Sequence, residues 1–218
     1  ARHFGLRDPQ REISVDAQIN SYDELAAGLP KDNLTILQLA RERARTLQRR
    51  PAGESSSDRA RLATVVRYKP ATVKHAWATA NTRNKGVVTQ SFQFQLSDDL
   101  PAAGVLLAAA STPATAPATI LLDDKGRKSA ATLASDRVNR GEQTLVLDLL
   151  FRGEVTPVKP GAPEYTQLLS AIGDRPLGIQ AAQLIAIARW LAARAGASRV
   201  RLESTGPRSQ VTALIAAA

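Results

Sequence analysis

The 218-residue chain is 44% hydrophobic and 22% charged, a composition that is typical of one ordinary globular domain or two small ones and that excludes a disordered or collagen-like chain. Because the sequence has no cysteine and only two histidines, His3 and His75, it excludes disulfide bonds, thiolate metal sites and most histidine-based metal clusters. No run approaches the ~18 consecutive apolar residues that cross a bilayer. We therefore expect no metal, no cofactor and no membrane partner.

The net charge of +9 invites a nucleic-acid interpretation, but its distribution argues against one. Residues 1–70 carry +4, residues 71–140 carry +3 and residues 141–218 carry +2, so the excess is spread along the chain. The one local basic run, residues 41–50, would point its arginines in several directions on a helix, which is typical of a solvated face. We expect no nucleic-acid partner.

The N-terminal part is predicted to be a lead-in with one helix. Residues 1–30 have an irregular pattern with a short acidic turn at 22–25. Asp32 or Asn33 can cap a helix whose apolar positions follow helical spacing until Arg50 and Pro51. Residues 51–58 are rich in serine, with glycine and proline, which indicates a flexible connector. The predicted division is therefore residues 1–58 and residues 59–218.

A strand-like period follows the connector. The residues from 87 to 96 alternate cleanly, with Phe92, Phe94 and Leu96 on one face. A turn at 97–101 then precedes another apolar stretch, so we expect an antiparallel hairpin. The strands predicted in this region cover residues 62–68, 73–79, 87–96 and 104–110.

The C-terminal half alternates apolar strands with helices. Each strand is a continuous apolar run, which predicts a parallel sheet buried under helices on both of its faces. The predicted strands are 118–122, 144–149 and 199–204, the predicted helices are 129–140, 176–194 and 211–218, and a long loop covers 152–163. The fold class is therefore α/β, with an antiparallel hairpin leading into a mostly parallel sheet.

Three segments carry a family resemblance, at residues 117–126, 145–154 and 200–218. The order and residue pattern of these segments resemble the α/β-hydrolases, and bacterial acetyl xylan esterases most of all, over roughly residues 85–218. The resemblance implies a serine carboxylic-ester hydrolase that deacetylates plant polysaccharide, a small-molecule or polysaccharide ester as substrate, and a secreted or periplasmic setting. It also implies that Asp148, at the end of a strand, organises the loop that follows.

The nucleophile turn of that family, G-x-S-x-G, is altered in this chain. When Gly206 takes the place of the first glycine, Arg208 stands at the nucleophile position, Gln210 at the second glycine and Ser209 one residue late. Arginine cannot attack an ester because its guanidinium stays protonated. Two hypotheses follow, and the sequence leaves both open.

In the first hypothesis, Ser209 occupies the tip of the turn and is the nucleophile, and the resemblance implies that the amide of Gln210 and that of Asp124 or Lys125 donate to the oxyanion. In the second, Arg208 occupies the tip. The elbow, with Gly206, then binds a carboxylate or sugar acid, or is structural, and forms no acyl-enzyme.

The catalytic triad is incomplete in this sequence. In the family the acid and the histidine follow the nucleophile, yet no histidine, aspartate or glutamate follows Ser209. His75 precedes the parallel sheet, beside Trp77, where a structural or surface role is expected. The lack of methionine suggests a processed or excised segment. We expect the early part of a hydrolase fold, incomplete at its C-terminus and completed by further residues or another chain.

Overall fold

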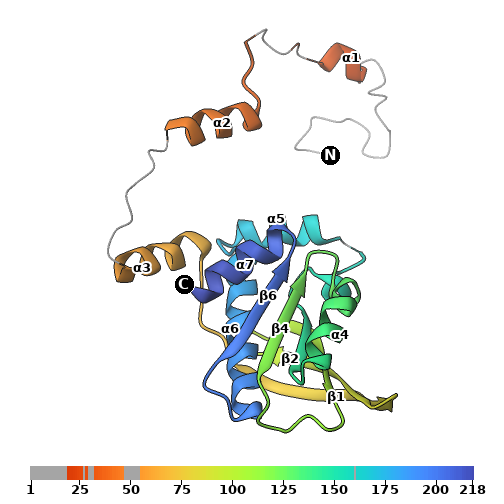
Figure 1. Cartoon of the computed structure of the whole chain (residues 1–218). Helices are drawn as coiled ribbons and strands as arrows, with labels where there is room; N and C mark the ends of the chain where they lie inside the picture. The colour runs from red at the N-terminus through yellow and green to blue at the C-terminus, as the bar shows by residue number, and fades with distance from the viewer. Residues whose placement is uncertain (1–18, 27, 29–31, 47–54, 160) are drawn as a thin grey trace, which may run out of the picture. The chain divides into compact units, whose positions relative to one another are not determined.

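The computed structural model describes the chain except for residues 1–18, 27, 29–31, 47–54 and 160 (Figure 1). It divides into two units, Ala1–Pro51 and Ala52–Ala218. Most of the predicted lead-in, and the predicted helix stop at Arg50 and Pro51, lie outside the described residues. No described helix is long and apolar enough to span a membrane.

The first unit contains two helices, α1 (Tyr22–Leu25) and α2 (Ile36–Thr46). The predicted cap of α2 at Asp32 or Asn33 is wrong, because the cap is Thr35. The hydroxyl of Thr35 accepts a hydrogen bond from the Gln38 amide, and the Gln38 side chain accepts one from the Thr35 amide. This reciprocal capping box satisfies two backbone donors, more than a single aspartate or asparagine could.

The second unit begins with α3 (Ser55–Val66), where the sequence predicted a connector to residue 58 and a strand over 62–68. Tertiary packing explains this error. The end of α3 lies against the start of α6 (Pro176–Ala195), where Gly178 has no side chain and lets the carbonyl of Val66 approach closely. Val66 is 4% exposed there, so burial against α6 outweighs the strand propensity of the β-branched residues.

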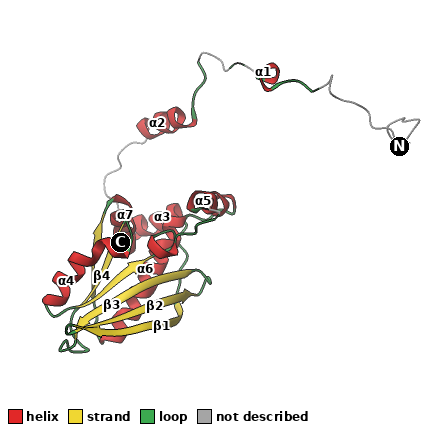
Figure 2. Cartoon of the chain, turned by 90° about the vertical axis from the view of Figure 1, so that its right-hand side faces the viewer, coloured by secondary structure: helices red, strands yellow, loops and turns green. Residues whose placement is uncertain are grey.

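A single six-stranded sheet forms the centre of the second unit, in the order β1-β2-β3-β5-β4-β6. The first three strands form an antiparallel meander, shown side by side in Figure 2, and β4 pairs in parallel with both β5 and β6. The predicted hairpin and parallel sheet are therefore confirmed. The strands are β1 (Val73–Asn84), β2 (Val87–Leu96), β3 (Pro101–Ala109), β4 (Ala118–Asp123), β5 (Gln143–Asp148) and β6 (Val200–Thr205).

Helices cover both faces of this sheet, as predicted. Alternate residues of β4 belong to different cores: Ile120 packs in the cluster that contains Leu184 and Ile187 of α6, whereas Leu121 packs with Ala134 of α4 (Ala131–Asn139). Because consecutive strand residues point to opposite faces, a strand buried on both sides must be apolar throughout. This explains the unbroken apolar run of β4.

The remaining helices depart from the predicted boundaries. α5 (Ala162–Ala171) falls in a region that was assigned no helix, and α7 (Pro207–Ala217) begins four residues before the predicted start at Val211. Proline at the first position of α7 is compatible with a helix start, since its missing N–H would have no partner there. Both helices lie at the end of the sheet to which the strands β4 and β6 point (Figure 1).

Candidate functional site

The turn from β6 into α7 is the place where an α/β-hydrolase carries its nucleophile. β6 ends at Thr205, and Gly206 links it to α7 with φ 89° and ψ 151°. Within residues 200–218, Gly206 is the only residue with positive φ. The positive-φ residue of this turn is therefore a glycine, which has no side chain to present above the sheet, and Arg208 and Ser209 lie in the first turn of the helix.

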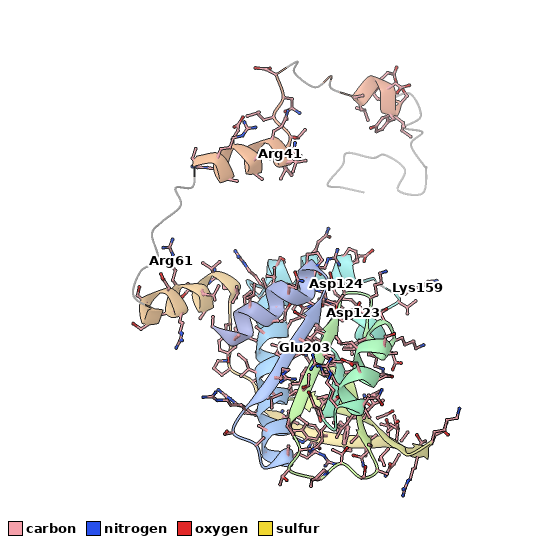
Figure 3. The ribbon with its side chains drawn as sticks, viewed as in Figure 1. Arg41, Arg61, Asp123, Asp124, Lys159 and Glu203 are labelled. Carbon is pink, nitrogen blue, oxygen red and sulfur yellow. The ribbon has the colours of Figure 1, made fainter. Side chains whose placement is uncertain are left out.

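Asp124, which lies in the loop after β4 (Figure 3), fills the space next to the Cα atom of Gly206. A Cβ atom at position 206 would lie 2.5 Å from the Asp124 Cγ atom. The Asp124 carboxylate accepts hydrogen bonds from the Ser209 amide at 2.7 Å and the Arg208 amide at 3.1 Å. It therefore caps α7 from a neighbouring loop, the role that a side chain within the helix usually has.

Ser209 is held by the same carboxylate. Ser209 is only 4% exposed, and its hydroxyl donates a hydrogen bond of 2.7 Å to the Asp124 carboxylate. Burial would raise the pKa of Asp124, but the hydrogen bonds from Ser209 and Arg208, together with the charge of Arg152, outweigh burial and keep this pKa below its usual value. The carboxylate is thus a stable anion that accepts a hydrogen bond from the hydroxyl and is too weak a base to remove its proton.

The three backbone amides predicted to form an oxyanion hole all have acceptors within the protein. The Asp124 amide donates to the Thr205 carbonyl at 3.1 Å, and the Gln210 amide donates to the Gly206 carbonyl at 3.0 Å as part of the helix. The Lys125 amide donates to the Asp123 carboxylate at 2.8 Å. An oxyanion hole needs donors directed at the reacting oxygen, and these three point elsewhere.

His75 lies on the edge strand opposite the one that leads into the elbow. It belongs to β1 and stacks on Trp77, with ring centroids 5.1 Å apart. Because β1 and β6 are opposite edges of the described sheet, the strand order separates this histidine from Ser209. Among the described residues, no group of three or more acidic, histidine or cysteine side chains could hold a metal ion.

A second carboxylate builds the neighbouring loop at the same end of the sheet. Asp148, at the end of β5, is fully buried and accepts hydrogen bonds from the amides of Arg127 at 2.8 Å and Glu154 at 3.1 Å. Gly153 approaches it so closely that a Cβ atom there would overlap the carboxylate. Asp148 thus organises the loop after β5, as the resemblance implied.

Arginine side chains also gather near the elbow, and sequence reasoning identified only one of them. Arg208 is exposed, and Arg152 lies with its guanidinium 3.9 Å from the Asp124 carboxylate. Arg152 and Arg175 stand in irregular segments before helices, far apart in sequence from Arg208. No local pattern links the three, so only the fold brings them together.

The overall geometry defines the class of this protein: a sheet ordered β1-β2-β3-β5-β4-β6, with helices on both faces and a strand-to-helix elbow at Gly206, is the α/β-hydrolase fold. Solved structures agree. The chain is similar to a candidate acetyl xylan esterase from Bacteroides fragilis, with a TM-score of 0.68 and 12% identity over 87% of this chain and 59% of that one.

Two further acetyl xylan esterases have the same fold. The enzyme from a Paenibacillus species gives a TM-score of 0.55 at 15% identity, covering 84% of this chain and 60% of its own. The enzyme from a Thermoanaerobacterium species gives 0.50 at 12% identity, covering 77% and 56%. This chain therefore spans about three fifths of the length of these esterases. No protein-family model and no curated protein sequence matches it.

Proposed function

We propose that residues 59–218 are the N-terminal part of an α/β-hydrolase-fold domain that uses its elbow to bind a ligand and does not form an acyl-enzyme there. One observation supports this most strongly. The positive-φ position of the elbow is Gly206, and the Asp124 carboxylate occupies the space into which a nucleophile side chain would project.

The surrounding hydrogen bonds support the same conclusion. Serine acyl transfer needs a hydroxyl that can reach the substrate and amides that can bind the oxyanion. The Ser209 hydroxyl is buried against Asp124, and the amides of Asp124, Lys125 and Gln210 donate to other acceptors. To act in acyl transfer, the Ser209 hydroxyl would have to leave Asp124, and the three amides would have to leave the Thr205 carbonyl, the Asp123 carboxylate and the Gly206 carbonyl.

The second candidate is a carboxylic-ester hydrolase that removes acetyl groups from a polysaccharide or a small ester. The fold it shares with acetyl xylan esterases favours this function. It requires Ser209 to leave Asp124 and turn toward the substrate. It also requires a catalytic histidine and a catalytic acid, and neither is among the residues of this chain that follow Ser209.

Serine reactivity separates the two candidates. We would incubate the natural full-length protein with a fluorophosphonate probe, and separately with p-nitrophenyl acetate, and compare it with S209A. Ser111, an exposed serine in the turn after β3, provides the matched control S111A. We expect no labelling and no hydrolysis above background. Hydrolysis that is lost in S209A and retained in S111A would contradict our proposal and support the ester hydrolase.

A further inference from the structure

An open groove lies beside the elbow, between α5, the loop after β5, and the first turns of α6 and α7. Its volume is about 950 Å³, close to the upper end of the range for small-molecule sites. Figure 1 shows α5 and α7 together at the end of the sheet to which β4 and β6 point, which is where open α/β sheets bind ligands.

Arginine dominates the charge of this groove. Arg152, Arg175 and Arg208 line it, and no acidic residue is among its lining residues. The guanidinium groups of Arg175 and Arg208 are exposed and have no hydrogen-bond or ion-pair partner among the described residues. Burial lowers the pKa of Arg152, the charge of Asp124 opposes this, and the nearby charge of Arg208 lowers the pKa further, so the two arginines lie close enough to repel each other.

One carboxylate near these arginines offsets their charge only partly. Asp124 lies 3.9 Å from Arg152, beyond good hydrogen-bonding distance, and its oxygens already accept the amides of Arg208 and Ser209. Its single negative charge cannot balance three arginines. Three arginine side chains line one cavity, and their charge is best balanced by an anion from outside.

The rest of the lining is suited to an uncharged body attached to that anion. Phe151, Leu177 and Val211 offer apolar surface, and Thr166 and Gln167 add hydroxyl and amide groups from α5. Such a mixture favours an organic molecule over a bare inorganic ion, since apolar contacts contribute affinity that a small ion cannot use.

We propose that the groove between α5, α6 and α7 binds a sugar-sized organic anion, whose carboxylate or phosphate is held by Arg152, Arg175 and Arg208. This inference deepens the proposed function, because it identifies the ligand class of the binding elbow. Guanidinium groups suit both anions, since their paired donors match two oxygens of either group.

Calorimetric titration of the natural full-length protein tests this inference, with four probes: D-glucuronate, D-glucose 6-phosphate, D-glucose and inorganic phosphate. We expect one of the two charged sugars to bind and glucose not to bind, with inorganic phosphate weaker than the bound sugar. The tighter of the two charged sugars identifies the carboxylate or the phosphate as the preferred group. Binding should weaken as salt is added.

Charge reversal locates the site. R208E and R175E should each weaken binding by about tenfold or more, because each removes charge-assisted hydrogen bonds and adds a like charge. The matched control is R83E, on the exposed part of β1 outside the groove lining, and it should change affinity by less than about twofold. Neither Arg175 nor Arg208 has a buried side chain, so these variants should fold.

Three results would overturn the inference: glucose binding as tightly as the charged sugars, no probe binding at all, or R175E and R208E binding like the parent protein. These results are independent of serine reactivity. Labelling of Ser209 together with arginine-dependent binding would contradict the non-catalytic elbow and leave the anion site intact. No labelling and no binding would contradict the anion site alone.

Discussion

Asp124 and Asp148 lie at the carboxyl end of the parallel strands, whereas Glu142 lies at the amino end, and the donors they bind differ in kind. The two aspartates accept hydrogen bonds mainly from backbone amides of loops and of α7. Glu142 accepts them from side chains: the hydroxyl of Thr119 and the guanidinium groups of Arg137 and Arg201.

This difference has a structural consequence. A carboxylate that accepts amides fixes the path of the main chain, so its loss changes loop conformation as well as charge. Side-chain donors can turn toward other acceptors; Arg137, for example, also pairs with Glu203. We therefore expect the carboxyl end to be stiff and sensitive to substitution, and the amino end to be tolerant. A stiff carboxyl end would also keep the Ser209 hydroxyl and the elbow amides on their present acceptors.

The largest effect should come from D148A. It leaves the amides of Arg127 and Glu154 without an acceptor in a buried site and should lower the free energy of unfolding by about 3–4 kcal/mol. Chemical denaturation measures this loss. The control is D136A, which removes an exposed i,i+4 pair with Arg140 and should cost less than about 0.5 kcal/mol. Equal losses in the two variants would contradict the expected stiffness of the carboxyl end.

G206A should have the next largest effect, a loss of about 2–3 kcal/mol, from positive φ and from overlap of the new methyl group with Asp124. Gly141 is a matched control, because its φ is also positive, at 78°, but a Cβ atom there would meet nothing within 4 Å. G141A should therefore report backbone strain alone. In G206A/D124A the overlap is absent, so the combined loss should be smaller than the sum of the two single losses.

The Asp124 cap should also make stability depend on pH. The pKa of Asp124 in the folded protein lies below its usual value, so the anion stabilises the folded state at neutral pH. That contribution is present above about pH 4 and is lost as the pH falls through the lowered pKa. D124N should cost about 1–2 kcal/mol at neutral pH. Denaturation curves recorded from neutral to acidic pH should converge for the parent protein and D124N.

Much of this fold could be predicted from the sequence, because its main elements follow from local patterns. The continuous apolar run of residues 118–122 matches a strand that is buried on both faces. The alternation of residues 87–96 matches a strand that is buried on one face. α3 could not be predicted, since what stabilises it is the contact of Val66 with Gly178, far away in the chain. Local propensity carries no information about such a partner.

The elbow was harder to predict for a similar reason. The spacing of the G-x-S-x-G motif predicts Arg208 at the nucleophile position, whereas the residue with positive φ in this turn is Gly206. Spacing alone cannot give φ angles, and the capping of Ser209 by Asp124 joins residues 85 positions apart. The arginine groove has the same origin, because Arg152, Arg175 and Arg208 become neighbours only through the fold.

The smallest effect should come from E142Q, at the amino end. The side chain of Glu142 is only 10% exposed, but glutamine keeps an oxygen that can accept the Thr119 hydroxyl. Arg137 retains Glu203, and the side chain of Arg201 is 52% exposed and can turn to solvent, so the loss should be about 1 kcal/mol. Salt sharpens the contrast between the two ends. Because the side chain of Arg201 is half exposed, added salt should screen its pair with Glu142 and so reduce the cost of E142Q, while the cost of D148A should stay almost unchanged. A salt-independent cost of E142Q, measured by chemical denaturation, would mean that the amino end is as rigidly fixed as the carboxyl end.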